Sequence, residues 1–170
     1  AGWLAGTPVT LAQTPPSEFQ VKAAFLVNFP KYVDWPPAAF AATNSPVVIA
    51  VLGETKVAEE LQKVVAGRKV NGREIVLKRL VAGAVTADCH ILFVSAAEQQ
   101  RTPNLVAQLN CCVLTVGESD GFLEHGGIIN LARRDRKVAL EVSLTAASKA
   151  GIEISSKLLA VANVVKGKAK

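Results

Sequence analysis

The sequence is poor in several residue types, and each shortage excludes a class of function. It contains no methionine, two histidines and nine aromatic residues of the Phe, Trp and Tyr types, in 170 residues. Two histidines are too few for a histidine-rich metal site, and no C-x-x-C spacing offers a zinc site. The G-x-S-x-G element of serine hydrolases and the lysine loop of nucleotide-binding proteins are both missing. We therefore predict no catalytic, cofactor-binding or metal-binding residues.

The sequence also lacks long apolar runs and dense charge. No run reaches 18 apolar residues, so no segment is predicted to span a membrane. The net charge is +5, and no aromatic residues are interleaved with the basic ones on which bases could stack. Nucleic acid is therefore not an expected partner. The basic residues form two small groups, which we interpret as a hairpin tip and a tail: Arg133, Arg134, Arg136 and Lys137, then Lys166, Lys168 and Lys170.

Half of the residues are hydrophobic and 19% are charged, which is enough apolar material for one folded domain. The opening AGWLAGTPVTLAQTPP resembles the end of a secretory signal with cleavage near Ala12. The alternative is an Ala/Pro-rich leader of an intracellular protein. We expect a disordered leader or signal remnant over 1–17, a single domain over 18–166, a basic tail over 167–170, and export.

Helix signals open the domain. Ser17 is a suitable N-cap for a helix from Glu18 toward Tyr32, which Pro30 should kink or end early. A second helix begins after Thr55 and closes at Gly67. Further helices are expected over 97–109, where Pro103 could restart the helix, and over 145–150 and 155–165.

Strand signals alternate with these helices. Short apolar, β-branched runs predict buried strands, and Asn71-Gly72 predicts a turn before an alternating strand. The expected strands are 47–52, 74–80, 90–95 and 111–116, followed by an antiparallel hairpin of 128–133 and 137–144. This order predicts an α/β fold with a mostly parallel central sheet flanked by helices on both faces. The architecture is Rossmann-like or flavodoxin-like, three-layered, with an antiparallel C-terminal hairpin.

The segment GESDGFLEHGGIIN, from Gly117 to Asn130, has the composition of a ligand loop. Its acidic residues would repel a phosphate, and its paired glycines precede a strand rather than a helix. We interpret it as a turn-rich approach to the hairpin, in which glycine allows positive φ or close backbone contact. An enzyme built on His125 or Asp120 is the remaining catalytic hypothesis, for which we expect no activity.

Three cysteines allow two interpretations. Cys89 lies just before one expected strand, and Cys111 and Cys112 lie at the start of the next, so a disulfide between Cys89 and one of the pair is sterically conceivable. The alternative is three buried thiols that pack as small hydrophobic groups.

Several segments of the chain match motifs of one known family. Glu18 to Pro36 matches V-K-A-A-[FY]-L-x-[NK]-F-x-K-[FY]-V-x-W-P and so resembles the helix signature of the YfiR-like periplasmic proteins. Further matches follow in the family's order: VVIAVLG at 47–53, CHILFV at 89–94, LTV at 114–116, GF at 121–122, GGIIN at 126–130, EV at 141–142, AA at 146–147 and SSKLL at 155–159.

The resemblance implies an exported regulator rather than a catalyst. The best-understood members repress an inner-membrane diguanylate cyclase by binding its periplasmic sensory domain, which lowers cyclic-di-GMP synthesis and biofilm formation. It also implies a homodimer, and partner-binding residues around Ile129, Glu141 and Ala147, whose alternative role is ordinary packing. Trp35 is a further candidate anchor, or a core tryptophan.

The sequence departs from the family pattern at positions that bear on redox control. Neither the strand 47–52 nor the stretch 119–127 carries the cysteines of disulfide-rich members, so Cys89 would need Cys111 or Cys112 as its partner. Pro30 and Ser143 also replace residues usual in the family.

The alternative function is a small-molecule sensor that uses a cleft near Gly53 and Gly117, at the carboxyl ends of the strands.

Overall fold

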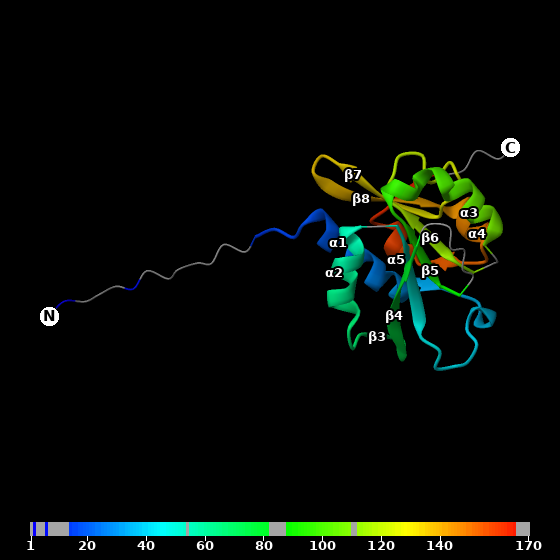
Figure 1. Ribbon diagram of the computed structural model, residues 1–170, viewed down its shortest axis with the longest axis horizontal. Coiled ribbons are helices and arrows are strands. Elements are labelled where there is room, and N and C mark those ends of the chain that lie inside the picture. The colour runs from blue at the N-terminus through cyan, green and yellow to red at the C-terminus, as the bar shows by residue number, and fades with distance from the viewer. Residues whose placement is uncertain are drawn as a thin grey trace.

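A mostly parallel β-sheet forms the centre of the protein (Figure 1). This computed structural model describes residues 2, 6, 14–53, 55–81, 88–109 and 112–165. Within them the sheet has eight strands, in the order β10-β8-β7-β6-β5-β2-β4-β3. Its four central neighbours are mutually parallel: β4 (Arg73–Leu80), β2 (Val47–Leu52), β5 (Ile91–Val94) and β6 (Leu114–Gly117). The predicted fold class is confirmed.

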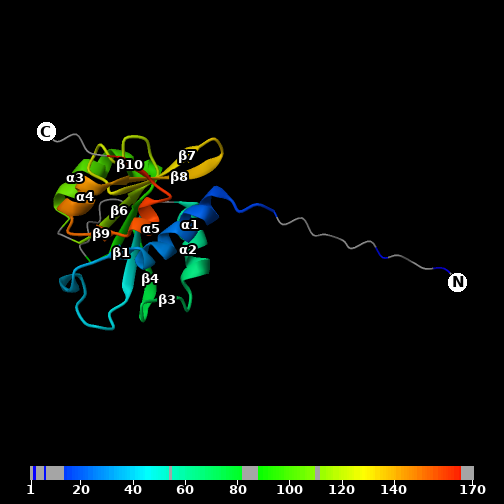
Figure 2. The ribbon, with the colours of Figure 1, turned by 180° about the vertical axis from the view of Figure 1, so that it is seen from behind.

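Antiparallel pairs flank the parallel centre. The strand β7 (Ile129–Arg134) is parallel to β6 and forms the predicted hairpin with β8 (Lys137–Ser143), which projects from the body of the protein (Figures 1 and 2). At the other edge β3 (Lys69–Val70) pairs with β4. The two-residue turns Asn71-Gly72 and Asp135-Arg136 have positive φ at both positions, as tight hairpin turns require.

Helices cover both faces of the sheet. On β2, Ile49 and Val51 face a core that includes residues of α1 (Glu18–Asn28), α2 (Lys56–Val65), α4 (Leu144–Lys149) and α5 (Ser156–Leu159). Ala50 and Leu52 face a smaller core with α3 (Thr102–Gln108), which follows the 3₁₀ helix η3 (Ala96–Arg101). The alternation follows from the two-residue period of a strand and gives the three expected layers.

The first helix begins where the sequence predicts. The Ser17 hydroxyl accepts from the Gln20 amide at 3.2 Å, and the Gln20 side chain accepts from the Ser17 amide at 2.9 Å. The α-helix ends at Asn28, and Pro30 lies in the 3₁₀ helix η1 (Phe29–Lys31). The chain then forms β1 (Val33–Asp34), which pairs with β9 (Glu153–Ile154), and the 3₁₀ helix η2 (Pro37–Ala39).

Two predicted boundaries are wrong. The strand expected over 111–116 begins only at Leu114, because Cys112 has φ +80° and its amide donates to the Ala150 carbonyl at 2.7 Å. The last helix ends at Leu159, and β10 (Asn163–Val165) replaces the rest of it. Its β-branched residues pair with the outer edge of β8, whose backbone offers hydrogen bonds that a helix could not use.

Candidate partner-binding surface

An apolar groove of about 620 Å³ lies between α1 and α5. It exists because α1 has more apolar residues than its buried face uses: Ala23 and Leu26 are in the core, while Val21, Ala24 and Phe25 line the groove. The other lining residues come from both ends of the groove: Pro16, Gln20, Asn28, Phe29, Tyr32, Lys157, Leu158 and Val161.

The β1–β9 pair places α5 beside α1. Val33 pairs with Ile154, and the Ser155 amide donates to the Tyr32 carbonyl at 2.8 Å. The hydroxyl of Ser155 then caps α5 by accepting from the Lys157 amide at 3.2 Å. Val161 follows on the rim of the groove and is 72% exposed. A rim valine in water next to a concave apolar wall is typical of a surface that binds another molecule.

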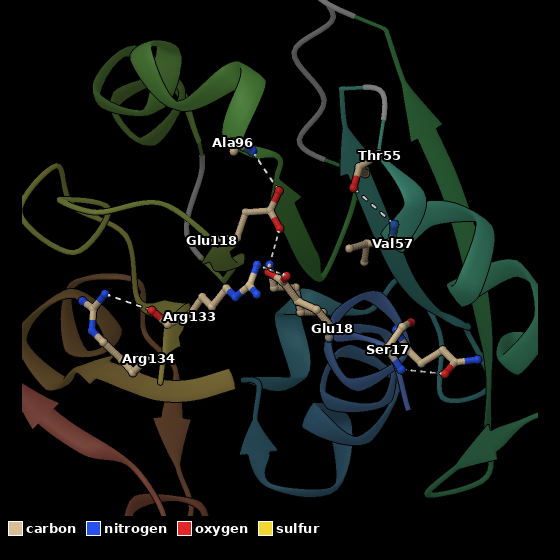
Figure 3. A network of polar contacts seen from close by, with 10 residues as sticks. Ser17, Glu18, Thr55, Val57, Ala96, Glu118, Arg133 and Arg134 are labelled. Carbon is tan, nitrogen blue, oxygen red and sulfur yellow. Dashed lines mark hydrogen bonds and ion pairs between the residues drawn. The ribbon is translucent and has the colours of Figure 1, made fainter. Parts of the chain in front are cut away.

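A buried ion-pair network lies at the other side of α1 (Figure 3). Lys22 is 3% exposed, and its Nζ lies 2.6 Å from Glu18 Oε1 and 2.7 Å from Glu118 Oε2. Glu118 also accepts from the Ala96 amide at 2.9 Å, and Arg133 Nη1 lies 3.5 Å from Glu18. The network joins α1 to the carboxyl ends of β5 and β6.

The charge state of this network follows from its contacts. Burial by itself lowers the pKa of Lys22, but hydrogen bonds and charges from Glu118 and Glu18 outweigh it, so the net pKa is raised. Lys22 is therefore a cation that fixes α1 against the sheet. Lys22 is not among the residues predicted from the sequence, although a lysine between Val21 and Ala23 on an apolar helix is a signal for it.

The structure places Glu141 in the middle of β8, with Asn130 of β7 on one side and Asn163 of β10 on the other. Its Oε1 accepts from Asn130 Nδ2 at 3.0 Å, and its Oε2 lies 3.8 Å from Arg134 Nη2. The Glu141 side chain is 23% exposed. It is therefore held in place, with part of its carboxylate left open to solvent.

Of the other three predicted binding residues, two are buried and one is half-buried. Ile129 and Ala147 are 0% and 2% exposed, and both belong to the main core. This agrees with the alternative role of ordinary packing. Trp35 is half-buried, packed against the same core. Of the four, Glu141 and Trp35 can present surface to a partner in this conformation, and neither lines the groove.

The Gly117 to Asn130 segment is organised around one phenylalanine. Phe122 is 1% exposed, and a Cβ added at Gly117 or Gly127 would lie 2.4 or 2.1 Å from its ring. These glycines therefore allow close packing of Phe122. Asp120 Oδ1 accepts from Arg134 Nη1 at 3.3 Å, and His125 is exposed. Among the described residues no group of three His, Cys, Asp or Glu side chains could hold a metal ion.

The expected cleft at the strand ends is filled at both glycines. A Cβ at Gly53 would lie 2.2 Å from Ser95 Oγ, and Phe122 occupies the position beside Gly117. Gly53 follows β2 and Ser95 follows β5, where an open α/β sheet would bind its ligand. The chain's own side chains occupy these positions, and the groove lies elsewhere, between α1 and α5.

Two cysteines lie at the amino ends of neighbouring strands. Cys89 lies two residues before β5 and Cys112 two residues before β6, and these strands are parallel neighbours, so both cysteines are at the same end of the sheet. Both are buried, while Cys111 lies outside the described residues. Burial raises the pKa of the Cys89 thiol to about 11; Lys78 lowers it and Asp88 raises it further. The predicted disulfide stays a prediction.

Comparisons with known proteins agree with this fold. A crystal structure of a conserved domain protein from Vibrio cholerae is similar, with a TM-score of 0.60 and 15% identity. The match covers 91% of this chain and 62% of the other, so this chain spans less than two thirds of that protein. No curated protein sequence matches. Among the described helices, none has the length and apolar character needed to cross a membrane.

A family model described as YfiR/HmsC-like matches residues 19–163. This range runs from the first turn of α1 into β10, so it includes both helices of the groove and the β7–β8 hairpin. The chain belongs to the YfiR/HmsC-like family.

Proposed function

We propose that this protein represses an inner-membrane diguanylate cyclase by binding its periplasmic sensory domain, and so lowers cyclic-di-GMP synthesis and biofilm formation. Family membership supports the pathway, and the exposed apolar groove between α1 and α5 supports action by contact. The proposal includes export to the periplasm after removal of a leader, and a homodimer as the resting form.

The groove has the properties of a protein-binding surface. Phe25 and Tyr32 supply partly exposed, large and rigid side chains at little entropic cost, and aromatic residues dominate binding energy at interfaces. Phe29 is 1% exposed and supports them from the core. Lys157 and Gln20 provide polar groups at the edge. Glu141 and Trp35 extend the proposed surface, whereas Ile129 and Ala147 would support it from the core.

The test changes one exposed groove residue. Val161→Asp places a charge on the apolar rim without touching the core, since Val161 is 72% exposed. We expect the affinity for the purified periplasmic domain of the cyclase, measured by calorimetry, to fall at least about tenfold, which corresponds to about 1.4 kcal/mol. Cells that carry the variant should show raised cyclic-di-GMP.

Val81→Asp is the matched control, because Val81 is 77% exposed and does not line the groove. It should bind as the parent does. An equal loss of affinity in both variants would contradict a role for the groove. The proposed function would be refuted if the parent protein did not bind the cyclase domain and deletion of its gene did not change cyclic-di-GMP.

A small-molecule sensor is the second candidate, and the size of the groove favours it. A volume of about 620 Å³ lies within the usual range of roughly 300–1,000 Å³ for such sites. A ligand bound there should raise the thermal midpoint of unfolding in the parent and less so in Val161→Asp.

A further inference from the structure

A cluster of rings holds the segment 36–46 against the amino end of the sheet. The ring of Phe40 stacks on the imidazole of His90 with 4.4 Å between centroids, and the guanidinium of Arg73 lies 3.7 Å from the Phe40 centroid. Trp35 meets both rings edge-on, at 6.4 Å from Phe40 and 6.2 Å from His90.

The hydrogen bonds of His90 require its neutral form. Nδ1 accepts from the Val48 amide at 3.0 Å, so the ring proton is on Nε2, which donates to the Ala39 carbonyl at 2.9 Å. One bond ends on β2 and the other on the segment, at the residue before Phe40. The neutral imidazole therefore bridges the sheet and the segment.

Protonation would break this arrangement. A second ring proton on Nδ1 would face the N–H of Val48, so the bond would become a contact between two donors. Arg73, the charged group that acts on His90, would then have a second cation close to it. Asp88 and Lys78 are the charged groups that act on the adjacent Cys89.

The electrostatic balance agrees with the geometry. Burial lowers the pKa of His90 from 6.5; the bond to Ala39 raises it, and Arg73 lowers it again, with a net lowering. Stacking on the Phe40 ring by itself favours the cation and opposes this lowering. The neutral contacts are thus present above pH 6.5 and are lost as the pH falls through the lower pKa of the folded state.

Arg73 separately holds the far end of the segment. Its Nη1 donates to the carbonyls of Ala42 and Ser45, at 3.1 and 2.7 Å. The Ser45 hydroxyl also accepts from the Ala42 amide at 2.9 Å, which closes the turn. Loss of the His90 contacts would therefore remove the bond that holds Ala39 to the sheet, while Arg73 keeps the turn at 42–45 attached and still faces the Phe40 ring.

We propose that His90 is a pH-operated latch: its protonation releases residues 36–41 from the sheet and exposes the Trp35 and Phe40 rings. The indole Nε1 of Trp35 is buried without a hydrogen-bond partner in the described part of the chain. Opening the segment would give this donor access to water, which favours release once His90 is charged. The latch does not depend on the identity of any partner.

Tryptophan fluorescence of the full chain tests the latch. Trp35 and Trp3 are the two tryptophans, so a Trp3→Phe background leaves Trp35 as the reporter. Between pH 8 and pH 5 we expect its emission to move to longer wavelength, with a midpoint below 6.5, while far-UV circular dichroism stays unchanged. His90→Asn should abolish this transition, because its amide oxygen can accept from Val48 but does not titrate.

His125→Asn is the matched control, since His125 is exposed and remote in sequence from the cluster; the transition should remain. Histidine NMR titration of the parent chain gives a second measurement that does not depend on how a variant folds: the His90 pKa should lie below 6.5. The latch is refuted if the transition survives in His90→Asn, or if Trp35 does not respond down to pH 5. It is also refuted if helical signal is lost at the same midpoint, or if His90 titrates at or above pH 6.5.

Discussion

Lys22 is a charged side chain held almost entirely inside the protein, at 3% exposure. Its two carboxylate partners come from different places: Glu18 one turn earlier on α1, and Glu118 immediately after β6. Because Glu118 is itself only 10% exposed, removal of the lysine would leave a carboxylate desolvated without a cation. The pair therefore makes the position of α1 specific.

Lys22→Met should lower the free energy of unfolding by about 3 kcal/mol. Adding Glu118→Gln to it should recover a large part of this loss, since the buried charge is then gone while the bond to the Ala96 amide remains. Urea denaturation of the single and double variants measures the coupling.

Lys63→Met is the control for lost charge. Lys63 pairs with Glu60 at 2.9 Å, but its side chain is 68% exposed, so stability should change by less than about 0.5 kcal/mol. Similar losses at Lys22 and Lys63 would contradict the assigned role of burial.

At the scale of an element, the segment from Gly117 to the start of β7 folds around Phe122. The ring lies under two glycines that have no Cβ, and the Gly127 amide donates to the Phe122 carbonyl at 3.0 Å. The Ile128 amide donates to Thr115 Oγ1 at 3.0 Å, which fixes where β7 begins. The composition of this segment is thus explained by packing.

Gly127→Ala should destabilise the protein by about 1–3 kcal/mol, because the new methyl group overlaps the Phe122 ring. The double variant Gly127→Ala/Phe122→Leu should lose less than the sum of the two single changes. Gly6→Ala, where nothing lies within 4 Å, should leave the urea midpoint unchanged. An unchanged midpoint in Gly127→Ala would show that Phe122 does not pack as described.

At the scale of the whole molecule, two buried groups near the amino ends of the strands set limits on the stable pH range. His90 favours its neutral form, so stability falls as the pH drops below 6.5. Burial raises the pKa of the Cys89 thiol from 9.0 to about 11. The free energy of unfolding therefore falls as the pH rises from 9 toward 11.

The free energy of unfolding of the reduced protein should therefore be highest between about pH 6.5 and 9. The alkaline loss should be on the order of 2–3 kcal/mol, from two pKa units at about 1.4 kcal/mol each. Chemical denaturation across this range measures it, with Cys89→Ala as the variant that should lack the alkaline loss. If the parent protein loses stability at alkaline pH only when a reductant is present, and not under oxidising conditions, the result would support the predicted disulfide of Cys89.

Local signals in the sequence predict the element types well. The caps at Ser17 and Thr55, the apolar β-branched run of β2 and the turn at Asn71-Gly72 depend on neighbours within a few residues. The same reasoning fails at 160–165, where the spacing of apolar residues fits a helix but the open edge of β8 determines a strand. That edge is contributed by residues about twenty positions earlier.

The sequence by itself determined the fold class, the parallel central strands with their connecting helices, the C-terminal hairpin and the family, because these follow from short-range patterns and from motifs in a fixed order. It did not predict the short strands β1, β3, β9 and β10. Only the tertiary structure decided that Lys22 is buried, that Ile129 and Ala147 are core residues, and that α1 and α5 enclose a groove. Each of these depends on contacts between segments that are far apart in the sequence, and the local pattern of one segment does not specify which other segments it will contact.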